Sequence, residues 1–324
     1  MPFSPLDLLL AWLLDAVLGD PPQLPWPHPV VAIGRLISAL ECRVRGAATS
    51  AAALVLRGTV LWIVVVGGTV AAGWLLLAAT AALHPVLGHA AAVYLAYACL
   101  ATRDLADEAA DIAGTLRRGS LPGARRRLAR IVGRDTTAMD ATAVARSGIE
   151  SVAENSSDGV VAPLFYLSLG GVLGWGPLLG LAYKAVNTLD SMVGYHTPRH
   201  EHLGKVSARL DDLANWVPAR LTALLVAAAY GLRGGRAGRL LAVVRRDGSK
   251  HSSPNSGYPE AAFAAALGVQ LGGGASYGGV HRPAPLLGDP GPAPGATHLR
   301  RAVHLLWWIS ALGGMLAGAT LSLF

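Results

Sequence analysis

Three carboxylates recur at four-residue intervals near the middle of the chain. Glu150, Glu154 and Asp158 follow Arg146 at this spacing, and Asn155 lies beside them. If the segment is one helix, the carboxylates share a face and repel one another. Mg²⁺ with a phosphate ligand would offset that repulsion. We therefore predict a metal site, with Glu150 and Glu154 also catalytic and Asn155 contacting substrate. The alternative is a solvated surface ladder neutralised by Arg146.

A second polar run follows an uncharged segment. On a helix, Tyr183, Asn187 and Asp190 share a face, with Lys184 adjacent. A Lys or Asp that faces lipid at mid-bilayer costs roughly 2.5–3.5 kcal/mol. We expect these side chains to line a polar cavity, with Lys184 and Asp190 as candidate catalytic residues and Asn187 as a substrate ligand. The alternative is that they extend to the membrane interface.

The third feature is a pair of adjacent carboxylates, Asp211 and Asp212, one turn before Asn215. Such a pair is typical of ligands for Mg²⁺ or for a magnesium diphosphate, so both are candidate metal ligands. The alternative is an ion network with the arginines near the two ends of the segment. The apolar face of the helix is expected at Leu210, Leu213 and Val217.

Basic and small polar side chains gather between residues 245 and 260. Backbone N–H groups near a helix N-terminus, here expected at Pro259, suit an anion, so we predict a phosphate site. The run is not a Walker A motif. The alternative is a polar loop whose arginines anchor it on the cytoplasmic side. The candidate substrate ligands are Arg245, Arg246, Asp247, Lys250 and Asn255, and His251 is a candidate catalytic residue.

The composition indicates which elements must position these side chains. Of 324 residues, 52% are hydrophobic and 15% are charged, and the mean hydropathy is +0.44. These values exclude a disordered chain, a coiled coil and a basic nucleic-acid-binding domain. They predict an all-α, polytopic integral membrane protein forming a single domain, with roughly four to six membrane segments. The net charge of +7 suggests basic loops on the cytoplasmic side, such as residues 233–301.

Uncharged segments mark the expected membrane helices. Thr59–Leu83 and Ala302–Phe324 are each long enough to cross a bilayer. Pro85–Ala101 is expected to return after a break at His84. Val160–Tyr183 has a centre rich in Gly and Pro, which predicts a broken helix or a re-entrant pair.

Three smaller features complete the expectations. The N-terminal segment is predicted to form a short interfacial or re-entrant helix. The two cysteines, Cys42 and Cys99, are interpreted as small buried hydrophobic residues. Residues 278–295, rich in Gly and Pro, are expected to form an irregular loop.

Six short segments, taken together in their order along the chain, resemble one known family, although each segment alone would be a weak signal. Over nearly its whole length the chain resembles the CbiB-type cobalamin-biosynthesis family, called CobD in some bacteria. Trp26–Pro27 is a short insertion relative to the family pattern, and residues 202–205 are more polar than expected. The segments are Leu14–Pro21, Pro27–Val30, Glu150–Gly159, Tyr183–Tyr195, Ser207–Arg220 and Asp247–Glu260.

The resemblance implies an integral ligase of the cell membrane, adenosylcobinamide-phosphate synthase. It implies ATP and Mg²⁺ as co-substrate and ion, and a corrinoid substrate, adenosylcobyric acid. An amino-alcohol phosphate, aminopropanol or ethanolamine phosphate, would be joined to a propionate of that corrinoid as an amide. Partners would be these substrates and the lipid bilayer, with other late cobalamin-pathway membrane enzymes as candidates and no nucleic acid.

This chemistry matches the residue inventory. A carboxylate must be activated before an amine attacks it, through an acyl phosphate or an acyl adenylate. Acids would hold Mg²⁺, cations would stabilise phosphate charge, and a carboxylate or His251 would take the amine proton. Two other classes stay open from the residues alone: an intramembrane Mg²⁺-dependent transferase acting on a lipid or isoprenoid diphosphate, and a non-enzymatic membrane scaffold.

Overall fold

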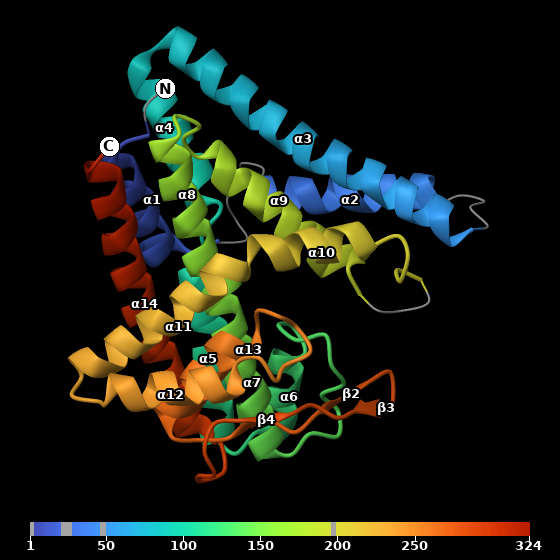
Figure 1. Ribbon diagram of the computed structural model, residues 1–324, viewed down its shortest axis with the longest axis vertical. Helices are drawn as coiled ribbons and strands as arrows, with labels where there is room; N and C mark the ends of the chain where they lie inside the picture. The colour runs from blue at the N-terminus through green and yellow to red at the C-terminus, as the bar shows by residue number, and fades with distance from the viewer. Residues whose placement is uncertain (1–2, 21–27, 46–49, 196–198) are drawn as a thin grey trace. The chain divides into compact units, whose positions relative to one another are not determined.

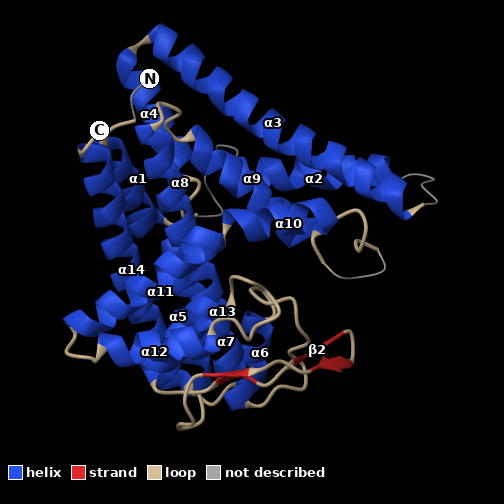
Figure 2. Cartoon of the chain, viewed as in Figure 1, coloured by secondary structure: helices blue, strands red, loops and turns tan. Residues whose placement is uncertain are grey.

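The computed structural model describes residues 3–20, 28–45, 50–195 and 199–324. Helices account for most of these residues (Figure 2), which confirms the all-α class. Residues 21–27, which hold most of the proline-rich N-terminal segment and the Trp26–Pro27 insertion, lie outside the described part.

The chain forms two compact units, each built from separate stretches of sequence. Unit 1 comprises Met1–Ala101, Ala162–Asn215 and Gly314–Phe324; unit 2 comprises Thr102–Val161 and Trp216–Gly313. The expected single membrane domain stays a prediction.

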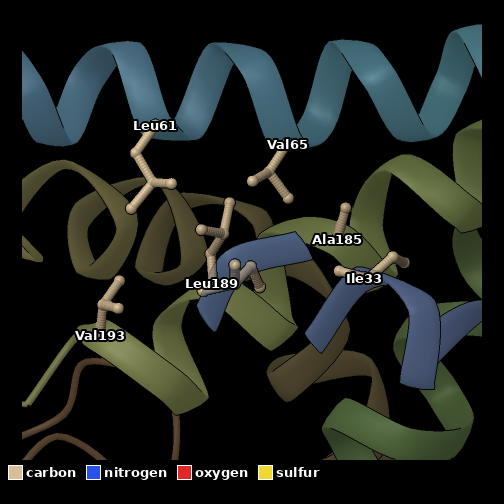
Figure 3. Packing of buried hydrophobic residues seen from close by; sticks show 7 residues of the cluster. Ile33, Leu61, Val65, Ala185, Leu189 and Val193 are labelled. Atoms are coloured by element: carbon tan, nitrogen blue, oxygen red, sulfur yellow. The ribbon is translucent and has the colours of Figure 1, made fainter. Parts of the chain in front are cut away.

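Long helices make up unit 1 (Figure 1). In it α3 packs on α2, α4 and α9, and α1 packs on α4. An apolar core joins α2, α3 and α9, with Ile33, Leu61, Val65 and Leu189 meeting at its centre (Figure 3). The helices are α1 (Pro5–Leu18), α2 (Pro29–Arg45), α3 (Ala51–Leu83), α4 (Pro85–Tyr97), α8 (Ala162–Val172), α9 (Leu178–Val193), α10 (Lys205–Ala214) and the end of α14 (Ala296–Ser322).

The hairpin of α3 and α4 forms as predicted, but α3 is longer than the uncharged segment Thr59–Leu83. Residue 84 separates the helices because its imidazole accepts the N–H of Val86 at 3.2 Å and Pro85 occupies the first turn of α4. Helix α3 begins eight residues before the uncharged segment, where Ser50 caps it. It accommodates Arg57 because that guanidinium donates to backbone carbonyl groups at the end of α2.

The segment Val160–Tyr183 is not one helix, which confirms the predicted break. It divides into α8 and α9, which pack against each other. The N–H groups of Trp175 and Gly176 both donate to the carbonyl of Gly170, at 2.7 and 2.9 Å. Gly174 and Gly176 have φ of 76° and 57°, a region that favours glycine. The chain reverses here because these glycines close a tight turn.

Unit 2 combines helices with short strands. Its helices are α5 (Thr102–Arg117), α6 (Leu121–Leu128), α7 (Ala141–Ser156), the π-helical turn η1 (Ser157–Val161), α11 (Trp216–Leu232), α12 (Ala237–Asp247), α13 (Gly257–Leu267) and the first part of α14. The expectation of an irregular loop at 278–295 is wrong in part, because this segment contains the second strand of each of two short antiparallel pairs. Strand β1 (Leu271–Gly272) pairs with β4 (Leu286–Leu287), and β2 (Ala275–Tyr277) pairs with β3 (Val280–Arg282).

Three helical stretches in the described part of the chain are long and apolar enough to cross a membrane. They are Ala51–Leu83, Pro85–Arg117 and Ala296–Ser322, and α10 with α11 would make a fourth if they form one broken span. Cys99 is buried as expected, but Cys42 is exposed, so its interpretation as a buried residue is wrong. The molecule is a polytopic helical membrane protein.

Candidate functional site

Glu150 is the most constrained carboxylate of the predicted acidic stripe. It lies on α7 with 4% of its surface exposed. One carboxylate oxygen accepts from Arg134 at 2.5 Å and the other from the backbone N–H of Gly272 at 2.8 Å. Burial opposes the charge on Arg134, but Glu150 beside it keeps the pKa of Arg134 raised. The interpretation as a surface ladder neutralised by Arg146 is therefore wrong for Glu150, whose partner is Arg134.

Glu154, one turn further on, faces outwards. It is exposed, and one of its oxygens accepts from the Ser256 hydroxyl at 3.0 Å. Ser256 directly precedes α13, so this bond joins the acidic helix to the run at 245–260. Asn155 is half-buried and its amide donates to the Ser151 carbonyl at 2.9 Å. The structure thus brings together two segments that lie about a hundred positions apart in the sequence.

A third glutamate, Glu260, completes this cluster, which we call the glutamate cluster (Glu150, Glu154 and Glu260). Glu260 lies in the first turn of α13 and is buried. Burial, reinforced by the charges of Glu150 and Glu154, raises the pKa of Glu260 well above its usual range, and Arg134 offsets this only in part. His251 places its Nε2 4.0 Å from Glu260. The cluster can therefore hold a proton on the Glu260 carboxyl.

Asp158 does not continue the stripe as expected. The α-helical repeat ends at Ser156, and Asp158 lies in the π-helical turn η1. A π turn adds a residue to the repeat, so the four-residue spacing does not extend to Asp158. Among the described residues, no three His, Cys, Asp or Glu side chains group closely enough to hold a metal ion. The Mg²⁺ role of Glu150, Glu154 and Asp158 stays a prediction.

The cations of the 245–260 run lie around Asp247. This carboxylate is buried and accepts from Arg246 at 2.7 Å, from Lys250 at 2.6 Å and from the N–H of Gly288 at 2.9 Å. The bonds from Arg246 outweigh the opposing effect of burial and, with the other donors, hold the pKa of Asp247 far below its usual range. Asp247 therefore organises the loop, and two of the predicted phosphate ligands already have a carboxylate partner.

The remaining residues of this run are placed by local contacts. Helix α13 begins at Gly257, two residues before the expected start at Pro259. The imidazole of His251 accepts the N–H of Ser253 at 3.0 Å. Arg245 is exposed at the end of α12, and no described residue forms an ion pair with it.

Arg220 is a residue of this site that sequence reasoning missed as a ligand. Its guanidinium donates to the Asn255 side chain at 3.0 Å and to the carbonyl of Pro254 at 3.1 Å. It also lies over the rings of Tyr258 and Trp216, 4.0 and 4.6 Å from their centroids. Arg134 and Glu260 were likewise missed. The available signal for Glu260 was a single charge directly before the apolar run 261–267.

Unit 1 holds a different polar cluster, which we call the amide cluster (Tyr183, Asn187, Asp211 and Asn215). Asp211 is buried and accepts from the side-chain amides of Asn187 at 3.3 Å and Asn215 at 3.0 Å. Asn215 in turn accepts from the Tyr183 hydroxyl at 2.8 Å. Tyr166 stacks on Tyr183, with ring centroids 4.9 Å apart. The predicted second and third motifs therefore meet between α9 and α10.

The other predicted residues of unit 1 lie around this cluster. Lys184 and Asp190 are half-buried on α9, and Asp190 and Asp212 are both near enough to Asp211 for their charges to act on it. The expected apolar face at Leu210, Leu213 and Val217 is wrong as a core face, and Val217 lies beyond the end of α10, on α11. Leu213 is 72% exposed and Val217 is 45% exposed, while Asp211 and Asn215 are buried. The polar face packs inwards because its hydrogen bonds are satisfied there.

Comparison with known proteins gives the family. A family model described as CobD/Cbib protein matches residues 8–306. Cobalamin biosynthesis protein CobD from Geobacter metallireducens is 47% identical over 96% of this chain and 94% of its own. CobD from Photorhabdus laumondii is 45% identical over 94% of each chain, and CbiB from Salmonella typhimurium is 43% identical over 94% of this chain and 93% of its own. No solved structure shows a significant match. The chain therefore belongs to the CobD/CbiB family of cobalamin biosynthesis proteins.

Proposed function

We propose that the protein is an ATP-dependent ligase of the cell membrane. It joins an amino-alcohol phosphate to a propionate carboxylate of adenosylcobyric acid and forms adenosylcobinamide phosphate. Family membership over residues 8–306 supports the pathway. The observation that carries the reaction class is the meeting of the acidic helix α7 with the run 245–260, through the bond between Glu154 and Ser256.

The reaction requires two bond changes. A propionate oxygen attacks the γ-phosphorus of ATP and displaces ADP, which forms an acyl phosphate, or it attacks the α-phosphorus and displaces pyrophosphate, which forms an acyl adenylate. The amine then attacks the activated carbonyl carbon, the phosphate or AMP departs with one former carboxylate oxygen, and the amine loses a proton. Both changes need cations near the phosphates and a base near the amine.

The glutamate cluster supplies suitable groups for these roles. Arg134 is held in place by Glu150, and Arg245 is exposed at the rim of the same unit. Arg134 would stabilise phosphate charge, and His251, next to Glu260, would receive the amine proton. Lys250 and Arg246 would assist from the loop that Asp247 organises. Asn155 and Asn255 would contact the substrates through their amides.

Mg²⁺ fits the donor set of Glu154 better than that of Glu150. Both oxygens of Glu150 already accept hydrogen bonds, whereas Glu154 is exposed and only one of its oxygens accepts, from Ser256. Magnesium is commonly held by one or two carboxylates together with substrate phosphates. Glu154 would hold the ion with phosphate oxygens, and the ion would neutralise charge on the phosphates of ATP.

The amide cluster of unit 1 would act on the substrate rather than on the phosphates. Lys184 and Asp190 stay candidate catalytic residues, and Asn187 stays a candidate substrate ligand. Asp211 and Asp212 stay candidates for a second cation site. The basic loops would face the cytoplasm, where ATP and the corrinoid are available.

A turnover assay tests the proposal. The purified protein is incubated with adenosylcobyric acid, MgATP and (R)-1-amino-2-propanol O-phosphate, and the amide product is measured by chromatography together with ADP and AMP. We expect one nucleotide consumed per amide formed, and no amide when ATP is omitted. Ethanolamine phosphate in a parallel reaction identifies the preferred amino alcohol. Amide formation without nucleotide consumption, or no amide with either amino-alcohol phosphate, would contradict the proposal.

A further inference from the structure

A cavity of about 460 Å³ lies in unit 2, away from the glutamate cluster residues named above. It is an open cavity bordered by the end of α11, the start of α12, one face of α13 and residues 289–290. These three helices pack on one another (Figure 1). Its size is within the range of small-molecule sites. None of its lining residues was predicted from the sequence or takes part in the proposed reaction.

Two arginines give this cavity an unusual charge. Arg236 is the N-cap residue of α12 and Arg239 lies in its first turn, and both line the cavity. No described residue forms an ion pair with either of them. A helix N-terminus carries partial positive charge, so cations there are unfavourable, and two cations three residues apart also repel. The first turn of α12 contains no acidic residue to offset this.

The rest of the wall does not neutralise these arginines. Asp289 is the acidic residue of the lining, and its carboxylate already accepts from Arg246 at 2.7 Å. Directly before Arg236, a Cβ at position 235 would lie 2.4 Å from the ring of Tyr230. The backbone before α12 therefore packs closely on this ring, which helps to fix the position of the N-terminus of α12.

We propose that this cavity binds a phosphate group. Guanidinium groups pair with phosphate through two hydrogen bonds, and the free N–H groups at the start of α12 favour the same anion. The phosphate belongs to a phosphorylated small molecule or to a lipid headgroup, because α12 follows directly after the apolar helix α11. This inference does not depend on the proposed ligase activity.

The test uses the full-length protein and two probes. Pyrophosphate is titrated into the protein in neutral detergent and followed by calorimetry. Thermal unfolding is then measured in nanodiscs of phosphatidylcholine with and without phosphatidylglycerol. The double variant Arg236→Gln/Arg239→Gln removes the charges, and Ala265→Leu fills the cavity from α13 while keeping them. Arg233→Gln is the matched control, since Arg233 lies in the same loop but does not line the cavity.

We expect the double variant and Ala265→Leu each to weaken pyrophosphate binding by about tenfold or more, with Arg233→Gln like the unmodified protein. If pyrophosphate does not bind, but phosphatidylglycerol raises the unfolding temperature and both variants lose that increase, the ligand is a lipid headgroup. The proposal is overturned if neither probe distinguishes the double variant from Arg233→Gln. It is also overturned if Ala265→Leu has no effect, because the cavity would then play no part.

Discussion

The two polar clusters of this protein differ in how their charges are balanced. In the amide cluster of unit 1, neutral donors contact the carboxylate: Asp211 accepts from two asparagine amides, while Asp190 and Asp212 act on it through their charges. In the glutamate cluster of unit 2, three carboxylates share one close cation, Arg134. The first arrangement is satisfied by its own hydrogen bonds. The second retains negative charge that an external cation could balance.

This difference separates two kinds of role. A polar network whose groups hydrogen-bond to one another holds helices and side chains in register, so its loss should reduce stability first. A cluster whose negative charge is only partly balanced, and which lies next to exposed cations, is suited to phosphates and metal ions. Its loss should therefore reduce turnover first.

Glu150→Gln should have the largest effect because it affects both stability and activity. The variant leaves the half-buried Arg134 without its carboxylate partner, and the cost of breaking a fully buried pair, about 3–5 kcal/mol, is the upper limit. Thermal unfolding in detergent should show a clear decrease in Tm together with lost turnover. Restoring stability with Arg134→Met in the same chain, without restoring turnover, would sharpen the assignment. An unchanged Tm would show that this ion pair does not stabilise unit 2.

Glu154→Gln should reduce turnover by about 10²-fold or more with little change in Tm. Glu154 is exposed, and the variant removes its negative charge while the Gln side-chain oxygen can still accept from the Ser256 hydroxyl. Asp107→Asn is the matched control, since Asp107 is an exposed acid of the same unit that pairs with Arg103. Steady-state turnover at saturating ATP measures the effect. Near-normal activity would show that Glu154 is a surface residue with no part in the reaction.

Tyr183→Phe tests the amide cluster. The variant leaves the Asn215 oxygen without its donor, which should lower the free energy of unfolding by about 1–2 kcal/mol. Tyr195→Phe is the control because Tyr195 is an exposed tyrosine of the same unit. The unfolding midpoint in detergent is the measurement. If Tyr183→Phe is as stable as Tyr195→Phe, the cluster does not hold α9 and α10 in register.

The pH dependence of stability tests Glu260. Its folded-state pKa is raised above the usual value of 4.5, so in the window above that value the folded protein keeps a proton that the unfolded chain has released. Stability is then full below the unfolded pKa and decreases as pH rises through the folded pKa, by at most about 1.4 kcal/mol per pH unit. Glu260→Gln should flatten this decrease between pH 5 and 8, measured as Tm. Identical pH profiles for both proteins would contradict the raised pKa.

Much of the fold follows from local sequence signals. The hairpin at residue 84 and the turn at Gly174–Gly176 were predicted because proline, glycine and a missing charge act within a few residues. The start of α3 was not predicted, because the charge of Arg57 ends the uncharged pattern. The structure accommodates Arg57 through carbonyl groups that belong to another helix. The short strands near residue 280 depend on pairing across the chain, which no local pattern reports.

The candidate site was predictable in its parts but not in its partners. Glu150 and Glu154 were found from their spacing, and the 245–260 run from its composition. That Arg134 pairs with Glu150, and that Glu260 is buried beside both glutamates, depends on tertiary contacts between α7, α13 and the loops. The inversion of α10 has the same origin, since a membrane protein can expose Leu213 and bury Asp211.

The most direct test of the central claim follows the oxygen atoms of the substrate. Adenosylcobyric acid labelled with ¹⁸O in its reacting propionate is turned over with MgATP and aminopropanol phosphate, and the phosphate and AMP released are analysed by mass spectrometry. We expect one ¹⁸O per amide in the released phosphate or AMP, and a much lower rate of this transfer in Glu154→Gln but not in Asp107→Asn. Amide formed with no ¹⁸O in either product, or transfer undiminished in Glu154→Gln, would contradict the assignment of carboxylate activation to the glutamate cluster.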